Sequence, residues 1–240
     1  MELITTKIGL EMLARWGHLL AGVTWIGLLY YFNFVQMEYM KEAEAGAKSD
    51  VLRKLAPKAL WWFRWGAAFT VLTGIIIMGL RGGGMAIDIY VGALFGLIMF
   101  ANVWLVIWPN QKIVIASAEQ VAAGGEALPE AADALAIAGL TSRTNALFSI
   151  PMLYFMGASA HFMHPRFSVL AFLLITLIIV VLEYNAIYKQ LLRCPMTSKL
   201  AFLHKLPAGG RMGFLAKVPG VIHAGLGLTV LLYVILEIMP

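Results

Sequence analysis

The sequence predicts an all-α fold, a polytopic membrane helix bundle with about six transmembrane helices. Of its 240 residues, 61% are hydrophobic and 13% are charged, whereas soluble domains carry about 25% charged residues. Apolar stretches also recur along the whole chain, and each has roughly the 20 residues that a helix needs to cross a bilayer. Because these stretches are spread from one end to the other, residues 1–240 are expected to form a single integral membrane domain.

Six stretches qualify as membrane spans. They lie near residues 12–35, 59–80, 88–109, 144–164, 167–189 and 216–238. The first has no Asp, Glu, Lys or Arg between Trp16 and Met37. Arg64 lies toward one end of the second span, and Glu183 lies toward the end of the fifth.

The distribution of lysine and arginine predicts the orientation, because these residues are enriched in cytoplasmic connections. Most of them follow the first, third and fifth spans, and the opposite side has only Lys7, Arg15, Arg81 and Arg166. We therefore expect a multi-pass protein of the bacterial inner membrane with both termini in the periplasm. The net charge of +5 then reflects basic connections that orient the chain in the lipid bilayer. No nucleic-acid partner is expected.

Two histidines are predicted to lie at a similar depth near the outer edge of the bilayer. His18 is in the first span, and His161 is in the fourth, which runs the other way. An ionisable ring inside a membrane is costly and therefore points to a function. Gly22 and Gly157 lie one turn deeper than their histidines and leave room for a flat group. A b-type haem held between the first and fourth spans fits this pattern.

Two arginines extend the predicted haem site toward the membrane surface. Arg15 lies one turn outward of His18, and Arg166 lies just beyond His161, so both are expected to pair with haem propionates. Copper is the alternative metal for the same histidines, with His164 as a further ligand. In the ordinary alternative, the glycines only pack helices and each histidine hydrogen-bonds a neighbouring helix.

A second group of polar residues is predicted near the inner helix ends. His223, Glu183 and Arg64 form a possible proton path or quinone head-group site, since all three are costly in lipid. The alternative is structural, with Arg64 and Glu183 reaching toward the interface or forming one ion pair.

Four segments resemble a known family. They are HLLAGVTWIGLLYYFNFVQ, WWFRWGAAFTVLTG, NVWLVIWPNQK and SRTNALFSIPMLYFMGASAHF. Together they look like the membrane domain of the bacterial membrane-bound, cytochrome c-linked urate oxidase family, in its short stand-alone form that often carries an antitermination label. The resemblance implies a redox membrane protein whose functional histidines match His18 and His161, with electron exchange on the outer face.

The expected partners follow from the single cysteine, Cys194, which excludes the C-x-x-C-H attachment of a c-type haem within these residues. A separate periplasmic cytochrome c or a quinone is therefore expected to exchange electrons with a b-type haem in this chain. One alternative is a urate- or purine-oxidising enzyme, with Asn145, Asn102 and Arg143 in its pocket. Another is a cofactor-free accessory subunit of a larger membrane oxidase complex, with Gly225 and its neighbours Gly220 and Gly227 as packing surfaces.

Overall fold

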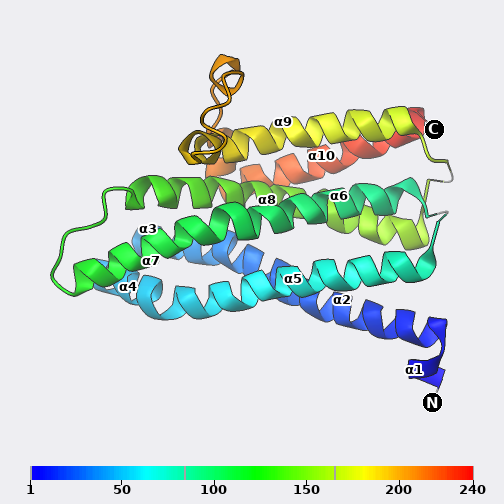
Figure 1. The fold of residues 1–240 in the computed structure, drawn as a ribbon, viewed down its shortest axis with the longest axis horizontal. Coiled ribbons are helices and arrows are strands. Elements are labelled where there is room, and N and C mark those ends of the chain that lie inside the picture. The colour runs from blue at the N-terminus through cyan, green and yellow to red at the C-terminus, as the bar shows by residue number, and fades with distance from the viewer. Residues whose placement is uncertain (1, 84, 165, 240) are drawn as a thin grey trace.

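The computed structural model describes residues 2–83, 85–164 and 166–239, and its long helices run roughly along one axis (Figure 1). Three long helices are continuous, and each has a π-helical segment between two α-helical ones. The first joins α2 Lys7–Tyr30, η1 Tyr31–Gln36 and α3 Met37–Glu42, and the second joins α4 Ala45–Asp50, η2 Val51–Leu55 and α5 Ala56–Arg81. The third joins α6 Ile87–Ala101, η3 Asn102–Ile107 and α7 Trp108–Ala122. The others are α8 Ala131–His161, α9 Val169–Arg193 and α10 Val218–Ile238. Short helices complete the fold: α1 Glu2–Thr5, η4 Leu203–Lys205 and η5 Gly213–Ala216.

The all-α membrane fold is confirmed. Within the described residues, five helices are long and apolar enough to cross a membrane, and they contain the first, second, third, fifth and sixth predicted spans. The fourth predicted span, 144–164, lies mostly in α8, which is not among the five. Helix α8 ends at His161, so residues 162–164 lie beyond it.

Helix α8 is the centre of the bundle, which explains its lower hydropathy. It packs against α2, α6, α7, α9 and α10, and nearly all of its residues from Ile137 to Met152 are buried. A helix that contacts protein on all sides has polar partners available and does not need an apolar surface for lipid. The side chains of Arg143 and Asn145 are therefore turned toward other helices.

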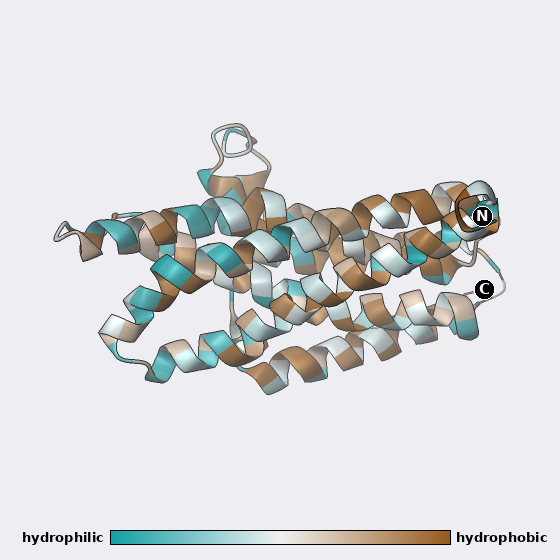
Figure 2. Ribbon diagram, turned by 90° about the horizontal axis from the view of Figure 1, so that it is seen from below, coloured by the Kyte–Doolittle hydropathy of each residue, from teal (hydrophilic) through white to brown (hydrophobic). Residues whose placement is uncertain are grey.

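The ends of the bundle differ. Both termini lie at one end (Figure 1), as the distribution of basic residues predicts. The three composite helices have 36 or 37 residues, or about 54 Å at ~1.5 Å per residue, and a bilayer core is only about 30 Å thick. Hydrophilic residues are most frequent toward the end opposite the termini (Figure 2), so this end carries the part of the helices that extends beyond the membrane.

Several contacts between the long helices depend on glycine, and the closest of these contacts is at Gly225. A Cβ added at Gly225 in α10 would collide with Ile150 Cδ1 and lie 3.0 Å from the carbonyl oxygen of Leu147, both in α8. Gly225 is therefore a packing surface within this chain. At Gly227, two residues later, a Cβ would have no heavy atom within 4 Å.

We expect Gly225→Ala to destabilise the protein by about 1–3 kcal/mol, because the added methyl group overpacks the contact between α10 and α8. Thermal unfolding in detergent measures the change. Gly227→Ala is the matched control and should change the stability by less than about 1 kcal/mol. Equal effects of the two substitutions would contradict this account of the packing.

Candidate functional site

A layer of buried polar side chains surrounds the middle of α8. On this helix, Thr141, Arg143, Thr144, Asn145 and Ser149 are each at most 3% exposed. We call these residues and Ser142 of the same helix, together with the side chains from other helices that are hydrogen-bonded to them directly or through one residue, the polar layer. The side chains from other helices are Tyr30, Asn33, Glu38, Asn102 and, through Asn102, Glu183.

One side of the polar layer joins α6–α7, α8 and α9 through two amides and a carboxyl group. The Asn102 side-chain Nδ2 donates to Asn145 Oδ1 at 2.9 Å and to Glu183 Oε2 at 3.0 Å. Asn145 in turn donates to the carbonyl oxygen of Met99 at 3.0 Å. Glu183 lies ten residues before the end of α9 at Arg193, or about 15 Å along the helix. This carboxyl group is therefore held inside the bundle, about three turns before the end of α9.

The other side of the layer faces α2, η1 and α3. The hydroxyl groups of Tyr30 and Ser149 are 2.9 Å apart, and Asn33 Nδ2 donates to Ser142 Oγ at 2.8 Å. Arg143, which is 2% exposed, donates to Glu38 Oε1 at 3.2 Å. These bonds connect the first long helix to the central one.

This second side also has unused hydrogen-bonding capacity. Arg143 Nη1, Asn33 Oδ1 and Gln36 Oε1 are buried without a protein partner. Buried polar atoms almost always bind protein, water or a ligand. One donor and two acceptors are thus available to a small polar molecule or to water.

Two π-helical segments supply side chains of the layer. Asn33 lies in η1, and Asn102 is the first residue of η3. π-Helical turns are uncommon and occur often at functional sites, because they change which side chains face a neighbour. The amides of Asn33 and Asn102 thereby reach α8 from two sides.

His18 is oriented by α5. The Nδ1 atom of His18 lies 2.9 Å from the carbonyl oxygen of Thr70. Because a carbonyl oxygen only accepts, Nδ1 carries the proton and donates this hydrogen bond. This contact leaves Nε2 as the free nitrogen, the arrangement usual for metal-binding histidines. A Cβ at Gly22, one turn deeper, would have no heavy atom within 4 Å. Nε2 of His18 is therefore available to a further partner, and the haem predicted at His18 stays a prediction.

The surroundings of His161 are different. Its side chain is exposed at the last position of α8, and it makes no hydrogen bond within the described residues. His18 contacts Thr73 of α5. Thr73 lies eight residues, or about 12 Å, before the end of α5 at Arg81. Helices α5 and α8 end on the same side of the bundle (Figure 1). The two histidines thus lie at different levels, and their joint binding of one haem stays a prediction.

The residues predicted to assist the two histidines are placed as follows. Arg15 binds Glu11 at 3.0 Å, and Arg81 binds the same carboxylate at 2.8 Å. Arg166 is exposed, and Gly157 has open space where a Cβ would lie. Pairing of Arg15 with a propionate would therefore compete with its bond to Glu11.

The structure separates the three residues of the predicted inner site. Glu183 belongs to the polar layer through Asn102. The guanidinium carbon of Arg64 lies 3.7 Å from the ring centre of Trp108, and His223 is exposed on α10. No hydrogen bond or ion pair joins any two of His223, Glu183 and Arg64 in the described part of the chain. A proton or quinone site built from this trio therefore stays a prediction.

A buried, hydrogen-bonded pair of Asp88 and His164, near the end with the termini, was not predicted. Asp88 is fully buried at the start of α6, and its Oδ1 lies 2.8 Å from His164 Nδ1. Its Oδ2 accepts from the backbone N–H of His164 at 2.8 Å. From the sequence, His164 was predicted only as a further copper ligand, but an acidic residue at the edge of an apolar span was a signal for such a pair. Asp88 therefore fixes the segment after α8.

Neither end of the bundle holds a cluster of metal ligands. Among the described residues, no group of three or more His, Cys, Asp or Glu side chains is arranged to bind a metal ion. His164 Nε2 has no hydrogen-bond partner, and Glu237 Oε1 is 3.7 Å from it, too far for a hydrogen bond.

Comparisons with known proteins give one match. A family model described as "Urate oxidase N-terminal" matches residues 83–202. The matched residues include Asn102, Asn145 and Glu183 of the polar layer and the pair of Asp88 and His164. They do not include His18. No curated protein and no solved structure matches the chain.

Proposed function

Because the chain belongs to the urate oxidase N-terminal family, we propose that it is a membrane oxidoreductase that oxidises urate or a related purine at the polar layer. In this proposal the electrons pass to a separate periplasmic cytochrome c or to a quinone. The observation that carries it is the group of Asn102, Asn145 and Glu183, buried inside the bundle and within the matched residues.

The chemistry of the layer supports a purine as the substrate. An oxidised purine carries alternating N–H donors and carbonyl acceptors around a flat ring. Amide side chains offer a donor and an acceptor side by side, and Arg143 offers donors for an anion.

Glu183 is assigned the proton transfer. A two-electron oxidation of the urate anion removes two electrons and one proton from the purine and leaves a neutral dehydro product. A quinone becomes a quinol by taking up both electrons, this proton and one proton from water; with two one-electron cytochromes, the proton is released to water. The Glu183 carboxylate, held by Asn102, accepts the proton as it leaves the ring nitrogen.

The membrane setting is part of the same proposal. We place the protein in a bacterial inner membrane with both termini in the periplasm, because the opposite end carries most of the basic residues. A periplasmic cytochrome would then meet the end formed by the termini, and a quinone would reach the protein from the bilayer. Association with a larger membrane complex is compatible with either acceptor.

The test is urate turnover by the purified full chain in proteoliposomes. Urate loss is followed with a soluble quinone or with oxidised cytochrome c as the acceptor, and empty liposomes are the control. We expect urate loss matched by acceptor reduction. The absence of turnover with both acceptors, in a protein that unfolds cooperatively, would overturn the proposal.

A second candidate function, haem-mediated electron transfer, is favoured by the orientation of His18. Its Nδ1–H is bound by Thr70, Nε2 is free, and the space beside Gly22 is open. A b-type haem would supply one-electron transfer between the purine site and the acceptor. In this candidate His18 holds the iron, Arg15 and Arg166 face the propionates, and His161 is the predicted second ligand. Copper is the alternative metal.

We expect the protein purified in mild detergent to show a b-type haem spectrum after reduction with dithionite. His18→Ala should remove the spectrum, because it deletes the oriented ligand. His161→Ala should do the same only if His161 is the second ligand. His204→Ala, which changes an exposed histidine elsewhere, is the control. A colourless wild-type protein without bound iron or copper would eliminate this candidate.

A further inference from the structure

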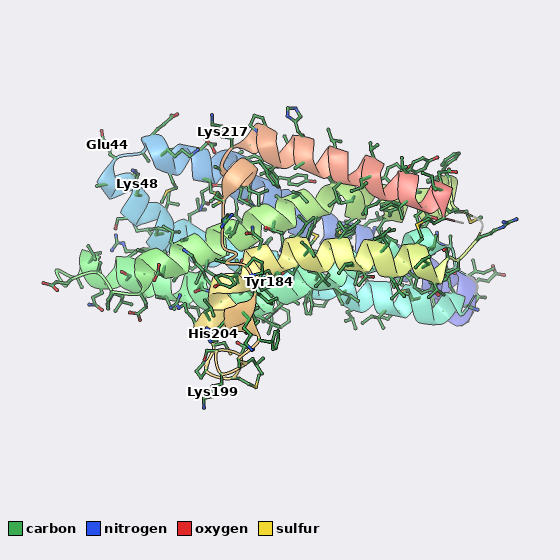
Figure 3. The ribbon with its side chains drawn as sticks, turned by 90° about the horizontal axis from the view of Figure 1, so that it is seen from above. Glu44, Lys48, Tyr184, Lys199, His204 and Lys217 are labelled. Carbon is green, nitrogen blue, oxygen red and sulfur yellow. The ribbon has the colours of Figure 1, made fainter. Side chains whose placement is uncertain are left out.

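The connection between α9 and α10, residues 194–217, is a distinct surface feature that we call the extension. It leaves the bundle sideways, at right angles to the long axis, in Figure 1. In Figure 3 the labelled Lys199 lies beyond the edge of the bundle, and His204 lies between Lys199 and the bundle. Its returning part is bound to α9. The Gly210 N–H donates to the carbonyl oxygen of Asn185 at 2.9 Å. The side-chain Nδ2 of Asn185 donates to the backbone carbonyl oxygen of Arg211 at 3.0 Å.

The extension is positively charged without compensation. No Asp or Glu occurs between Glu183 and Glu237. Its basic side chains are exposed and form no ion pair within the described residues; they are Lys199, Lys205, Arg211 and Lys217. Elsewhere in the chain, Lys41, Lys54 and Arg143 are paired with acids. The extension therefore offers cations to an external anionic partner.

Large apolar side chains are exposed beside these cations. Met196 is 80% exposed, Phe214 is 58% exposed and Phe202 is 57% exposed. Leu203 and Leu215, in contrast, are buried and hold the segment together. Basic side chains next to exposed aromatic and aliphatic ones are typical of segments that lie in a membrane interface.

The position of the extension places it at such an interface. It joins the ends of α9 and α10, which have 25 and 21 residues, or about 37 and 31 Å. These lengths are close to the thickness of a bilayer core, about 30 Å, and the returning part of the extension is bound at Asn185 of α9. The boundary therefore lies between Asn185 and the end of α9, and near the start of α10 at Val218. A segment that leaves this boundary at right angles to the helices runs parallel to the membrane plane.

We propose that the extension rests on the surface of the bilayer that the bundle crosses and binds anionic lipid head groups. Lys199, Lys205 and Arg211 provide the charge, because juxtamembrane basic residues are attracted to anionic lipids. Phe202 and its apolar neighbours enter the head-group region. The bound lipid surface fixes the segment between α9 and α10 and thereby the pairing of these helices. This inference does not depend on the oxidation of a purine.

The test uses a fluorescent probe at position 201 in the full chain. Cys194 is the single cysteine, so Cys194→Ser with Ala201→Cys gives one labelling site on the exposed residue before Phe202. The protein, labelled with an environment-sensitive dye, is placed in nanodiscs of phosphatidylcholine with or without phosphatidylglycerol. We expect emission to shift to the blue and rise about twofold when the anionic lipid is present. The rise should disappear in 1 M salt, where the Debye length falls to about 3 Å.

Matched variants separate this proposal from a general effect of charge. Lys199→Gln, Lys205→Gln and Arg211→Gln together should abolish the dependence on anionic lipid. Lys48→Gln, Lys58→Gln and Lys112→Gln remove the same charge from other elements and should leave it intact. Equal emission in the two kinds of nanodisc, as expected if the extension instead binds an acidic protein, would overturn the proposal. So would equal behaviour of the two triple variants.

Discussion

Asp88→Ala is expected to destabilise the protein by about 3–5 kcal/mol, one of the two largest effects we anticipate. The substitution leaves the buried His164 ring and its backbone N–H without the carboxylate that binds both at 2.8 Å. Removing one partner of a buried, hydrogen-bonded pair costs about this much, because the remaining group stays desolvated. Thermal or denaturant-induced unfolding of the purified protein in detergent measures the loss.

Two variants control for this prediction. Asp88→Asn keeps an acceptor of similar size and should cost less than Asp88→Ala. Glu237→Gln alters a half-exposed carboxylate that lies 3.7 Å from His164 Nε2, and it should cost no more than about 1 kcal/mol. If Asp88→Ala unfolds at the same temperature as the wild type, the pair contributes little to stability, and the segment after α8 is held by other contacts.

Glu183→Gln is expected to lower urate turnover by about 100-fold or more while the protein remains folded. The amide has nearly the same shape, so it can keep the contact with Asn102, but it cannot accept a proton from the substrate. Loss of a positioned general base costs about 10²–10⁴-fold in rate. The measurement is the turnover number in proteoliposomes, with unfolding temperature as the check on the fold.

The control for Glu183→Gln is Glu119→Gln, an equivalent change at an exposed position of α7. It should leave turnover unchanged. A further variant, Asn102→Ala, removes the donor to Glu183 and should reduce turnover without acting on a proton itself. If Glu183→Gln turns over urate at the wild-type rate, the carboxyl group is structural, and the proton acceptor lies elsewhere.

The helical spans could be predicted from the sequence because their signal is local. A run such as residues 167–189 is apolar along its whole length, and no other residue is needed to infer a helix in lipid. The fourth span shows the limit of this argument. Residues 141–145 are all polar, which is tolerated because α8 is surrounded by other helices. Hydropathy cannot distinguish a central helix from one that faces water.

The candidate site could be predicted only in part. Asn102, Asn145 and Arg143 were expected as a group, and the structure joins the two amides directly. Glu183 was assigned to a different trio with Arg64 and His223, because depth along a helix does not say which side of it a residue faces. The two π-helical segments that turn Asn33 and Asn102 toward α8 have no recognisable signal in a single sequence.

The amino-acid sequence by itself determined the class of the protein, five of the six predicted membrane spans and the common end of its termini, since hydrophobic length and basic connections act locally along the chain. Only the tertiary structure decided that α8 is central, that Glu183 joins Asn102 and Asn145, and that Asp88 binds His164 in place of solvent. The physical reason is that a side chain's partner depends on the rotation and neighbours of its helix. Both are set by packing between residues far apart in the chain.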